Sequence, residues 1–531
     1  MLDLAKLEEA VRFEGGVSRR LFLAYGASLS ALPLLGLRAE AKTQQPKFAA
    51  DPFRVGVASG DPTANGFVLW TRLAPRPLEP SGGMDPHNVE VNWEIADDEG
   101  MKHVIRRGKA VASPKLAHSV HVEVDNLEPG RWYWYRFRAG DATSAVGRTR
   151  TMPASDALAP ELNFAFASCQ HYESGYYTAY EHMAKDELDL VVHLGDYIYE
   201  GAGKDGQVRR HSNSTCESLD QYRVRHSQYK TDPLLQAMHL RCPWMVTWDD
   251  HEVANNYADD HPQFKDNQKV DPAKFLIRRA NAYQAYYEMM PLRRTSLPHG
   301  PNMQIYRPVT FGKLASFLML DGRQYRSEQP NNDKSGDLND ACKSPKNTML
   351  GKRQFGWVKD SLASSQATWN ILAQQVIMAT VDVKGGPERV FPVDEWCGYV
   401  DERNKLMSFM HDRKIANPVV LTGDNHSNWV NDLRTDDLRP ETPIVAAEFV
   451  GTSISSGGNG DQRRDKEKNL KAENAGVHFH NGERGYVRCK VTPELWQSDF
   501  RTVERINKPG APMQTRASFV VEAGQAGVKR A

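Results

Sequence analysis

Three short apolar runs in the sequence each end directly at a cluster of acidic and histidine residues. They are VVHLGDYIYEG (191–201), WMVTWDDHEVANN (244–256) and PVVLTGDNHSNW (418–429). A buried strand that ends in carboxylates and imidazoles places metal ligands at the rim of a sheet, and in open α/β folds ligands bind at this carboxyl edge. Three such ends, far apart in the chain, predict one site that holds more than one metal ion and uses bound water for hydrolysis.

The composition gives little support for a charged macromolecular partner. The chain has 531 residues with 67 basic and 67 acidic side chains, so its formal net charge is zero. A balanced charge does not favour a nucleic-acid partner or binding to an anionic membrane. The length predicts at least two domains and provides ample material for a large core.

The N-terminus has the features of an export signal. Arg19 and Arg20 precede a weakly apolar run over 21–37, and the small-x-small sequence at 39–41 matches a cleavage site. The paired arginines resemble a twin-arginine signal, so residues 1–41 are predicted to be a signal peptide recognised by the twin-arginine export machinery. The alternative is a membrane anchor, but the run contains Gly, Ser and Pro and is shorter than the ~20 apolar residues of a span. We expect a periplasmic or secreted protein with no membrane span after cleavage.

Six cysteines are spread over the chain. No two are spaced as Cys-x-x-Cys, which argues against a zinc ribbon or a thioredoxin-type motif. Disulfides form readily in the compartments that exported proteins reach. If Cys169 binds a metal, five cysteines remain and at most two bridges can form, and the sequence leaves their pairing open.

Two patterns follow one another along the chain. From about residue 53 to 153, stretches of alternating polar and apolar residues are separated by turn residues, which predicts a β-sandwich domain over 42–155. Its aromatic-rich stretch 127–140 resembles a late strand of a fibronectin type III sandwich. From about residue 162, buried strands alternate with amphipathic helices, which predicts an α/β domain over 156–531. The Gly/Ser-rich stretch 451–460 is expected to be a loop, either one that approaches a ligand or a mobile surface loop.

The residues at the strand ends form a candidate metal site. Asp196 follows a buried strand and a glycine, so its carboxylate can bridge two ions, and Tyr199 can turn toward the same ion. Each candidate alone also has a structural explanation: Cys169 as a small buried residue, Tyr199 as a core aromatic residue, and Asp196 or Asp250 as a helix cap. The agreement of several strand ends favours a shared site. Its predicted members are Cys169, Asp196, Tyr199, Asp249, Asp250, His251, Asn256, Asp424 and His426.

Short motifs at these positions resemble those of calcineurin-type metallophosphatases. The matching segments are Gly-Asp at 195–196, Asp-His-Glu at 250–252 and Gly-Asp-Asn-His at 423–426. The chain departs from that pattern where Ser-Cys-Gln (168–170) replaces Asp-x-His, Asp250 replaces Asn, and Asp424 replaces the first His of the last motif. These departures match the PhoD-like alkaline phosphatases, which the chain resembles over nearly its whole length. The resemblance implies an α/β protein in which a fibronectin III-like β-sandwich is followed by a metallophosphatase-type αββα sandwich.

The resemblance also implies a mixed site with one ferric ion (Fe³⁺) and calcium ions (Ca²⁺), two of which are suspected. Thiolate and phenolate suit Fe³⁺, Ca²⁺ prefers oxygen ligands, and the exchange of imidazoles for carboxylates argues against zinc. His251 is expected near the leaving group or the phosphate, and Glu448 is a weaker candidate oxygen ligand. Arg323 is expected to clamp phosphate or, equally, to form a structural salt bridge. Iron is assigned to Cys169, Asp196, Tyr199 and His426, and calcium to Asp196, Asp249 or Asp250, Asn256 and Asp424.

The predicted reaction is hydrolysis of phosphate monoesters and some diesters by a metal-bound hydroxide, as in an alkaline phosphatase. One alternative is a phosphodiesterase or phospholipase D-like enzyme that acts on phospholipid or wall polymer. Another is a non-catalytic protein that binds a polymer and uses its metals structurally. Other hydrolase motifs are incomplete: Gly175 stands where Cys-x₅-Arg needs its arginine, the sequence HEVAN (251–255) lacks the second His of a zinc protease, and the stretch at 451–455 lacks the last Gly of Gly-x-Ser-x-Gly.

Overall fold

The predicted N-terminal β-sandwich is confirmed. The computed structural model describes residues 47–263, 271–384 and 386–531, so the predicted signal at 1–41 lies outside the described residues. A sheet of β1, β2 and β5 faces a second sheet in the order β4-β3-β6-β7, with β8 paired to β6. The strands are β1 (Val57–Thr63), β2 (Gly66–Arg72), β3 (Val89–Ala96), β4 (Val104–Ala112), β5 (Ser119–Val124), β6 (Trp132–Ala139), β7 (Ala142–Thr143) and β8 (Gly147–Arg150).

The alternation in the sequence explains why these strands form two layers. In β6 the side chains of Tyr133, Tyr135 and Phe137 are buried, whereas the residues between them are partly exposed. They belong to the same apolar core as Phe67 and Leu69 of β2. Because successive side chains of a strand point to opposite faces, this pattern buries the inner face of the sheet that contains β6 and leaves its outer face to solvent.

One sheet of the sandwich continues into the second domain. β1 pairs in parallel with β11 (Trp244–Val246) at Gly60 and Trp244. The result is a ten-stranded sheet in the order β22-β21-β20-β19-β9-β10-β11-β1-β2-β5. A partly buried ion pair between Arg307 and Asp61 reinforces the junction (Nη2 to Oδ1 2.5 Å). The two domains are therefore joined by backbone hydrogen bonds as well as by side chains.

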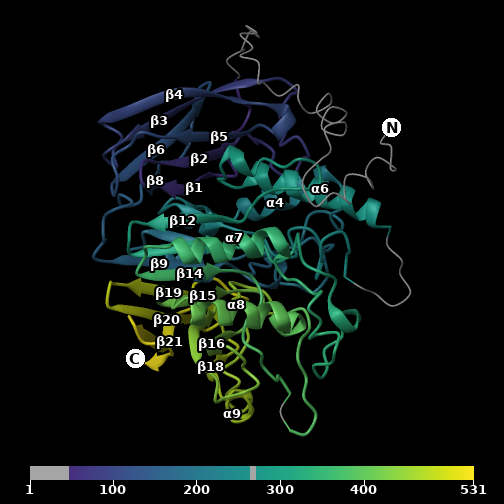
Figure 1. The fold of residues 1–531 in the computed structure, drawn as a ribbon. Coiled ribbons are helices and arrows are strands. Elements are labelled where there is room, and N and C mark those ends of the chain that lie inside the picture. The colour runs from purple at the N-terminus through teal and green to yellow at the C-terminus, as the bar shows by residue number, and fades with distance from the viewer. Residues whose placement is uncertain (1–46, 264–270, 385) are drawn as a thin grey trace, which may run out of the picture.

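The second domain has two sheets packed face to face with helices outside (Figure 1), which is the predicted αββα arrangement. A seven-stranded sheet, in the order β12-β13-β14-β15-β17-β16-β18, packs on the ten-stranded sheet through a core that includes Phe164, Phe317 and Phe449. Helices α3–α6 cover the outer face of the ten-stranded sheet, and α7 and α8 cover that of the other. The helices are α3 (Thr178–Met183), α4 (Leu219–Lys230), α5 (Pro233–His239), α6 (Pro272–Met289), α7 (Gly351–Ser364), α8 (Val400–Asp412) and α9 (Arg464–Glu473).

Parallel pairing brings the ligand-bearing strand ends together. β9, β10 and β11 are parallel neighbours in one sheet, and β14, β15 and β17 are parallel neighbours in the other. Beyond these carboxyl ends the sheets come into contact, since Ser168 and Ser453 form an isolated bridge. The strands of this domain are β9 (Leu162–Ala167), β10 (Leu190–His193), β12 (Arg307–Phe311), β13 (Ala315–Met319), β14 (Trp369–Ala373), β15 (Pro418–Thr422), β16 (Asn428–Arg434), β17 (Ile444–Val450), β18 (Val477–Asn481), β19 (Arg484–Val491), β20 (Leu495–Val503), β21 (Met513–Glu522) and β22 (Lys529–Arg530).

Two parts of the second domain differ from the sequence-based expectation. Helix α3 ends at Met183, although the helical pattern continues to 187, because turns at Lys185 and Asp186 lead the chain toward β10. Strands β18–β21 were not among the predicted elements, yet they pair with β16 and β9 and widen both sheets. Their alternation is obscured by buried polar residues such as Ser498 and Thr502.

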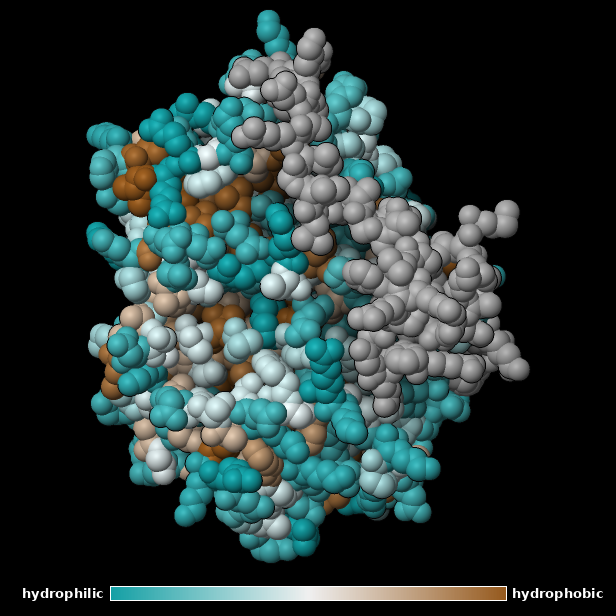
Figure 2. All heavy atoms as spheres, turned by 45° about the horizontal axis from the view of Figure 1, so that its top comes forward, coloured by the Kyte–Doolittle hydropathy of each residue, from teal (hydrophilic) through white to brown (hydrophobic). Residues whose placement is uncertain are grey.

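The face that carries the sandwich is mainly hydrophilic (Figure 2). Apolar residues form small separate patches on it, and hydrophilic residues surround them. Within the described ranges, no helix is both long enough and apolar enough to cross a membrane.

Candidate metal centre

Four predicted ligands meet just beyond β9, β10 and β15. Potential ligand atoms of Cys169, Asp196 and His426 all lie within 4.8 Å of one another. The Tyr199 hydroxyl oxygen lies 2.6 Å from Asp196 Oδ2 and 3.1 Å from His426 Nε2. We call Cys169, Asp196, Tyr199 and His426 the first ligand group. Its sulfur, phenol, imidazole and carboxylate donors suit a transition metal.

Asp196 also belongs to a set of carboxylates, which we call the second ligand group. Oxygen atoms within 4.8 Å of one another are offered by Asp196, Asp249, Asp250 and Asp424. Asn256 lies beside them, because its backbone N–H donates to Asp250 Oδ2 (2.6 Å). Its side-chain nitrogen donates to Asp333 Oδ2 (2.9 Å), which leaves the amide oxygen available for a cation. This side of the site contains only oxygen donors, the ligands that Ca²⁺ prefers.

Several members of the two ligand groups have a left-handed backbone conformation. The φ angle is 59° at Cys169, 57° at Asp196, 55° at Asp424 and 55° at His426. Such angles are uncommon for residues with a Cβ, and they cluster at functional sites where the surrounding structure enforces them. Here the chain turns sharply at the end of each strand, and the bond from Cys169 N to Gly195 O (3.1 Å) ties two of the turns together. The fold therefore directs these side chains to one place.

The second ligand group concentrates negative charge in a buried location. Burial raises the pKa of Asp196 and Asp424 well above the usual range and that of Asp249 to about 6, and the charge of Asp250 adds to each shift. Asp249 Oδ2 is buried and has no hydrogen-bond partner among the described residues. A bound cation stabilises carboxylates in such a position. The donor set and the unpaired oxygen both fit metal binding.

Burial keeps the first ligand group neutral in the absence of a cation. It raises the pKa of the Cys169 thiol and of the Tyr199 hydroxyl, and the charge of Asp196 adds to both shifts. It lowers the pKa of His426 to about 3, so the imidazole is neutral and can bind a metal directly. A thiol or a phenol in this setting loses its proton when a metal ion binds.

His251 lies at the edge of both ligand groups. Its backbone N–H donates to Asp250 Oδ1 (2.9 Å), and its ring lies over Tyr199 with centroids 4.1 Å apart. The ring Nδ1 is 2.7 Å from Glu200 Oε2, which fixes the ring orientation. Burial disfavours a charged ring, but Asp250, Glu200 and Asp196 outweigh it and hold the pKa of His251 above its usual range.

Arg323 is buried among carboxylates. Its Nε donates to Asp249 Oδ1 (2.6 Å), and its Nη1 donates to both oxygens of Asp394 (2.9 Å each). Its Nη2 is 3.8 Å from Asp424 Oδ1 and makes no hydrogen bond within the described residues. This arrangement favours the structural salt bridge over the phosphate clamp, with Arg323 as the support of Asp249.

Comparison with known proteins assigns the family. A family model described as PhoD-like phosphatase matches residues 164–500, and one described as PhoD-like phosphatase, N-terminal domain, matches residues 39–153. The chain belongs to the PhoD-like phosphatase family. Alkaline phosphatase D of Bacillus subtilis (strain 168) is 50% identical over 491 residues, which cover 91% of this chain and 83% of that protein. A solved structure described as the structure of PhoD is 49% identical, with a TM-score of 0.88, and the match covers 91% of this chain and 93% of that one.

The phosphatase also contains supporting residues that the sequence analysis did not assign. Glu252, which follows the predicted His251, accepts bonds from the backbone N–H groups of Asp196 (3.1 Å), Tyr197 (2.5 Å) and Asp249 (2.9 Å). It therefore joins the loops after β10 and β11 beneath the ligands. Glu200 and Glu252 stand next to predicted ligands in the sequence, and a search for carboxylates beside the motifs would have found them.

The Gly/Ser-rich loop 451–460 lies against the first ligand group of the phosphatase and is largely buried, so it is the loop that approaches the site. The hydroxyl oxygen of Ser456 is 2.7 Å from the Tyr199 hydroxyl and 2.7 Å from the Cys169 carbonyl oxygen. Arg484 holds the loop, because its Nε donates to Gly458 O (2.7 Å) and its Nη1 donates to the His426 carbonyl. No sequence motif marks Arg484, which is far from the loop in the chain.

Glu448 lies outside both ligand groups of the phosphatase. Its carboxylate accepts bonds from Met378 N (2.7 Å), Ala379 N (3.0 Å), Thr422 Oγ1 (2.8 Å) and Asn431 Nδ2 (2.9 Å). Both oxygens are thus engaged in joining β17 to neighbouring segments, which gives Glu448 a structural role.

Proposed function

We propose that this chain is an exported, metal-dependent alkaline phosphatase that releases phosphate from monoesters and, more slowly, from some diesters. The observation that carries the proposal is that two ligand groups of different chemistry share Asp196 at one edge of the sheets. A carboxylate common to both groups can hold two kinds of ion close enough to act on one phosphate. Membership in the PhoD-like phosphatase family supports the reaction class.

The donor chemistry supports the choice of ions in this proposal. Cys169, Tyr199 and His426, together with Asp196, would hold Fe³⁺, because thiolate and phenolate suit a ferric ion. The carboxylates of the second ligand group, together with the Asn256 amide oxygen, would hold Ca²⁺, of which two are expected. When bound, these ions supply charge neutralisation of the phosphate oxygens and acidification of water.

The side chains of the protein would perform the remaining steps. His251 lies beside the shared carboxylate, and Glu200 fixes its ring through Nδ1, so Nε2 can deliver a proton to the leaving oxygen. Arg323 would keep Asp249 in place and offset part of the buried negative charge. Ser456 would hold the Tyr199 oxygen in its position. These side chains would hold the reacting groups in place. The proposal specifies the rest of the phosphate ester only loosely.

The experiment that tests this function combines elemental analysis of the purified protein with rates on two matched substrates, p-nitrophenyl phosphate and bis(p-nitrophenyl) phosphate. We expect iron and calcium in the protein, a higher kcat/KM for the monoester and an alkaline optimum. A higher kcat/KM for the diester would favour a phosphodiesterase that acts on phospholipid or wall polymer. A protein with its metals in place that cleaves neither ester would be a non-catalytic binding protein, and the proposal would be wrong.

Export is part of the proposal and has its own test. Arg19 and Arg20 precede a weakly apolar run, the arrangement of a signal for folded proteins. We expect cleavage near Ala41 and loss of export in the Arg19→Lys/Arg20→Lys variant. N-terminal sequencing of the extracytoplasmic protein decides this, since an intact Met1 on the exported form contradicts cleavage.

A further inference from the structure

Two cysteines lie together outside the metal centre. Cys342 and Cys397 belong to one small cluster of buried apolar residues with Leu338, Phe391 and Val393. Both thiols are free, and both residues are buried. Burial raises the pKa of the Cys397 thiol, and the charges of Glu395 and of Cys342 itself add to the shift, as expected for neighbouring groups. The other four cysteines lie at the metal centre or in the cores of the second domain.

The backbones that carry the two cysteines are already joined. Val400 N donates to the Cys342 carbonyl oxygen (3.2 Å), and Val400 is three residues after Cys397. Gly336 and Phe391 exchange two backbone hydrogen bonds, of 3.2 Å and 2.8 Å. A disulfide requires Cα atoms about 4.4–6.8 Å apart, and membership in one small cluster places the two cysteines near each other. A bond between the two sulfurs also requires the Cys397 thiol to turn away from the Pro392 carbonyl oxygen, to which it donates (2.7 Å).

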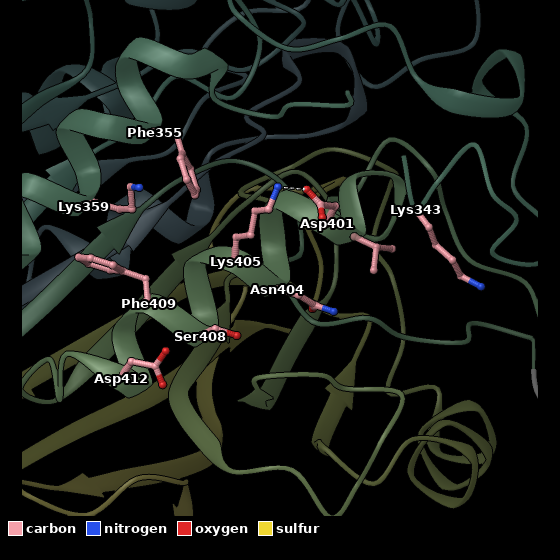
Figure 3. Close-up of a pocket in the computed structure, with 10 residues that line it drawn as sticks. Lys343, Phe355, Lys359, Asp401, Asn404, Lys405, Ser408, Phe409 and Asp412 are labelled. Atoms are coloured by element: carbon pink, nitrogen blue, oxygen red, sulfur yellow. Dashed lines mark ion pairs between the residues drawn. The ribbon is translucent and has the colours of Figure 1, made fainter. Parts of the chain in front are cut away.

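The cluster is close to an open groove (Figure 3). This groove has a volume of about 640 Å³, lies between α7 and α8, and is lined by Lys343 and Val400 among others. Lys343 is adjacent to Cys342 in the chain, and Val400 packs against the cluster. Asp340, Ala341 and Lys343 are exposed, so a local opening of this turn would bring Cys342 to solvent.

We propose that Cys342 and Cys397 form a disulfide when the folded protein meets a small disulfide oxidant. The Cys342 thiolate attacks one sulfur of the oxidant, which forms a mixed disulfide and releases one thiol. The Cys397 thiolate then attacks Cys342 Sγ and releases the second thiol. The two protons from the cysteines and the two electrons end on the released thiols, so the exchange balances.

The cross-link would stabilise a segment that supports the metal centre. Asp394, three residues before Cys397, holds Arg323 Nη1 (2.9 Å) and also accepts a bond from Gln329 Nε2 (2.6 Å). A bond from Cys397 to Cys342 would fix this segment to the turn that contains Cys342. The disulfide is thus expected to stabilise the support of Arg323 and not to take part in the reaction.

The test uses the purified holoenzyme incubated with oxidised glutathione, after which free thiols are alkylated and peptides are mapped by mass spectrometry without reduction. We expect the Cys342 and Cys397 peptides to be linked, and the thermal midpoint to rise by about 5 °C, because a long loop is closed. The Cys342→Ser/Cys397→Ser variant should show no rise, whereas Cys216→Ser, a control in another cluster, should keep it. Recovery of both peptides in alkylated form, or a link to a different cysteine, overturns the proposal.

Discussion

The two ligand groups share Asp196, yet the protein supports them in different ways. The first group is nearly neutral, and its supports bind hydroxyl and backbone oxygens: Ser456 contacts the Tyr199 hydroxyl, and the buried guanidinium of Arg484 binds carbonyl oxygens around His426. The second group is rich in carboxylates, and a buried guanidinium, Arg323, supports it. A buried thiol and a buried phenol lose their protons most readily to a highly charged ion, whereas crowded carboxylates accept a hard divalent ion. The comparison teaches that one edge of two sheets can present two chemically distinct metal environments.

Removing the shared carboxylate should have the largest effect, because it alone belongs to both groups. We expect Asp196→Asn to lower kcat on the monoester and on the diester together, by about 10³-fold or more, and to reduce both the iron and the calcium content. Parallel rate measurements and elemental analysis check this, with Asp401→Asn, in the groove between α7 and α8, as the matched control. A tenfold loss of turnover corresponds to an activation barrier raised by about 1.4 kcal/mol. If Asp196→Asn keeps a tenth of the wild-type turnover, the two groups act independently.

Removing calcium should affect the second ligand group and leave the first one intact. A calcium-selective chelator is expected to abolish most of the activity while iron stays bound, because only the second ligand group is built from oxygen donors. Added Ca²⁺ should restore activity better than Zn²⁺. Activity and iron content are measured on the same sample before and after chelation. Full activity after exhaustive chelation would contradict the assignment of the carboxylate side to calcium.

The sequence predicted which residues come together in the two groups because each follows a buried strand. Asp196, Asp249 and His426 stand directly beyond apolar runs, and parallel pairing brings such ends together whatever their distance in the chain. The chain departs from the usual metallophosphatase motifs at residues such as Cys169 and Asp424. These departures give the two ligand groups their different donor atoms. The residue types of the two ligand groups can therefore be read from the few residues that follow each strand.

The supports of the ligands could not be predicted in the same way. Arg484, the first residue of β19, reaches the loop of Ser456 although α9 and β18 separate them in the chain, and Asp394 reaches Arg323 from a loop 71 residues further along. Such contacts depend on the tertiary fold and leave no periodic pattern. The sheet shared at Gly60 and Trp244 was missed for the same reason, since a parallel pair of distant strands has no turn to mark it.

Changes to the iron side should reduce activity less than the loss of the shared carboxylate and should change the colour. Thiolate and phenolate bound to Fe³⁺ give charge-transfer absorption in the visible range, so we expect a coloured protein. Tyr199→Phe should shift or bleach the band and lower kcat about 10- to 100-fold, and Cys169→Ala should bind little iron. Calcium content should stay the same in both variants. A colourless, iron-free wild-type protein with full activity would refute the iron assignment.

The smallest expected effect concerns the hydroxyl that touches the first group. Ser456 Oγ is 2.7 Å from the Tyr199 hydroxyl. We expect Ser456→Ala to lower kcat by about tenfold or less, since only the contacts of one neutral hydroxyl are lost, and to shift the charge-transfer band without loss of iron. Ser455→Ala is the matched control, because its hydroxyl bonds the His171 carbonyl (2.9 Å) and does not contact Tyr199. The absorption spectrum shows whether Ser456 acts on the Tyr199 oxygen or only holds the loop. An unchanged band in Ser456→Ala would mean that Ser456 only holds the loop, and that the members of the first group alone determine its absorption.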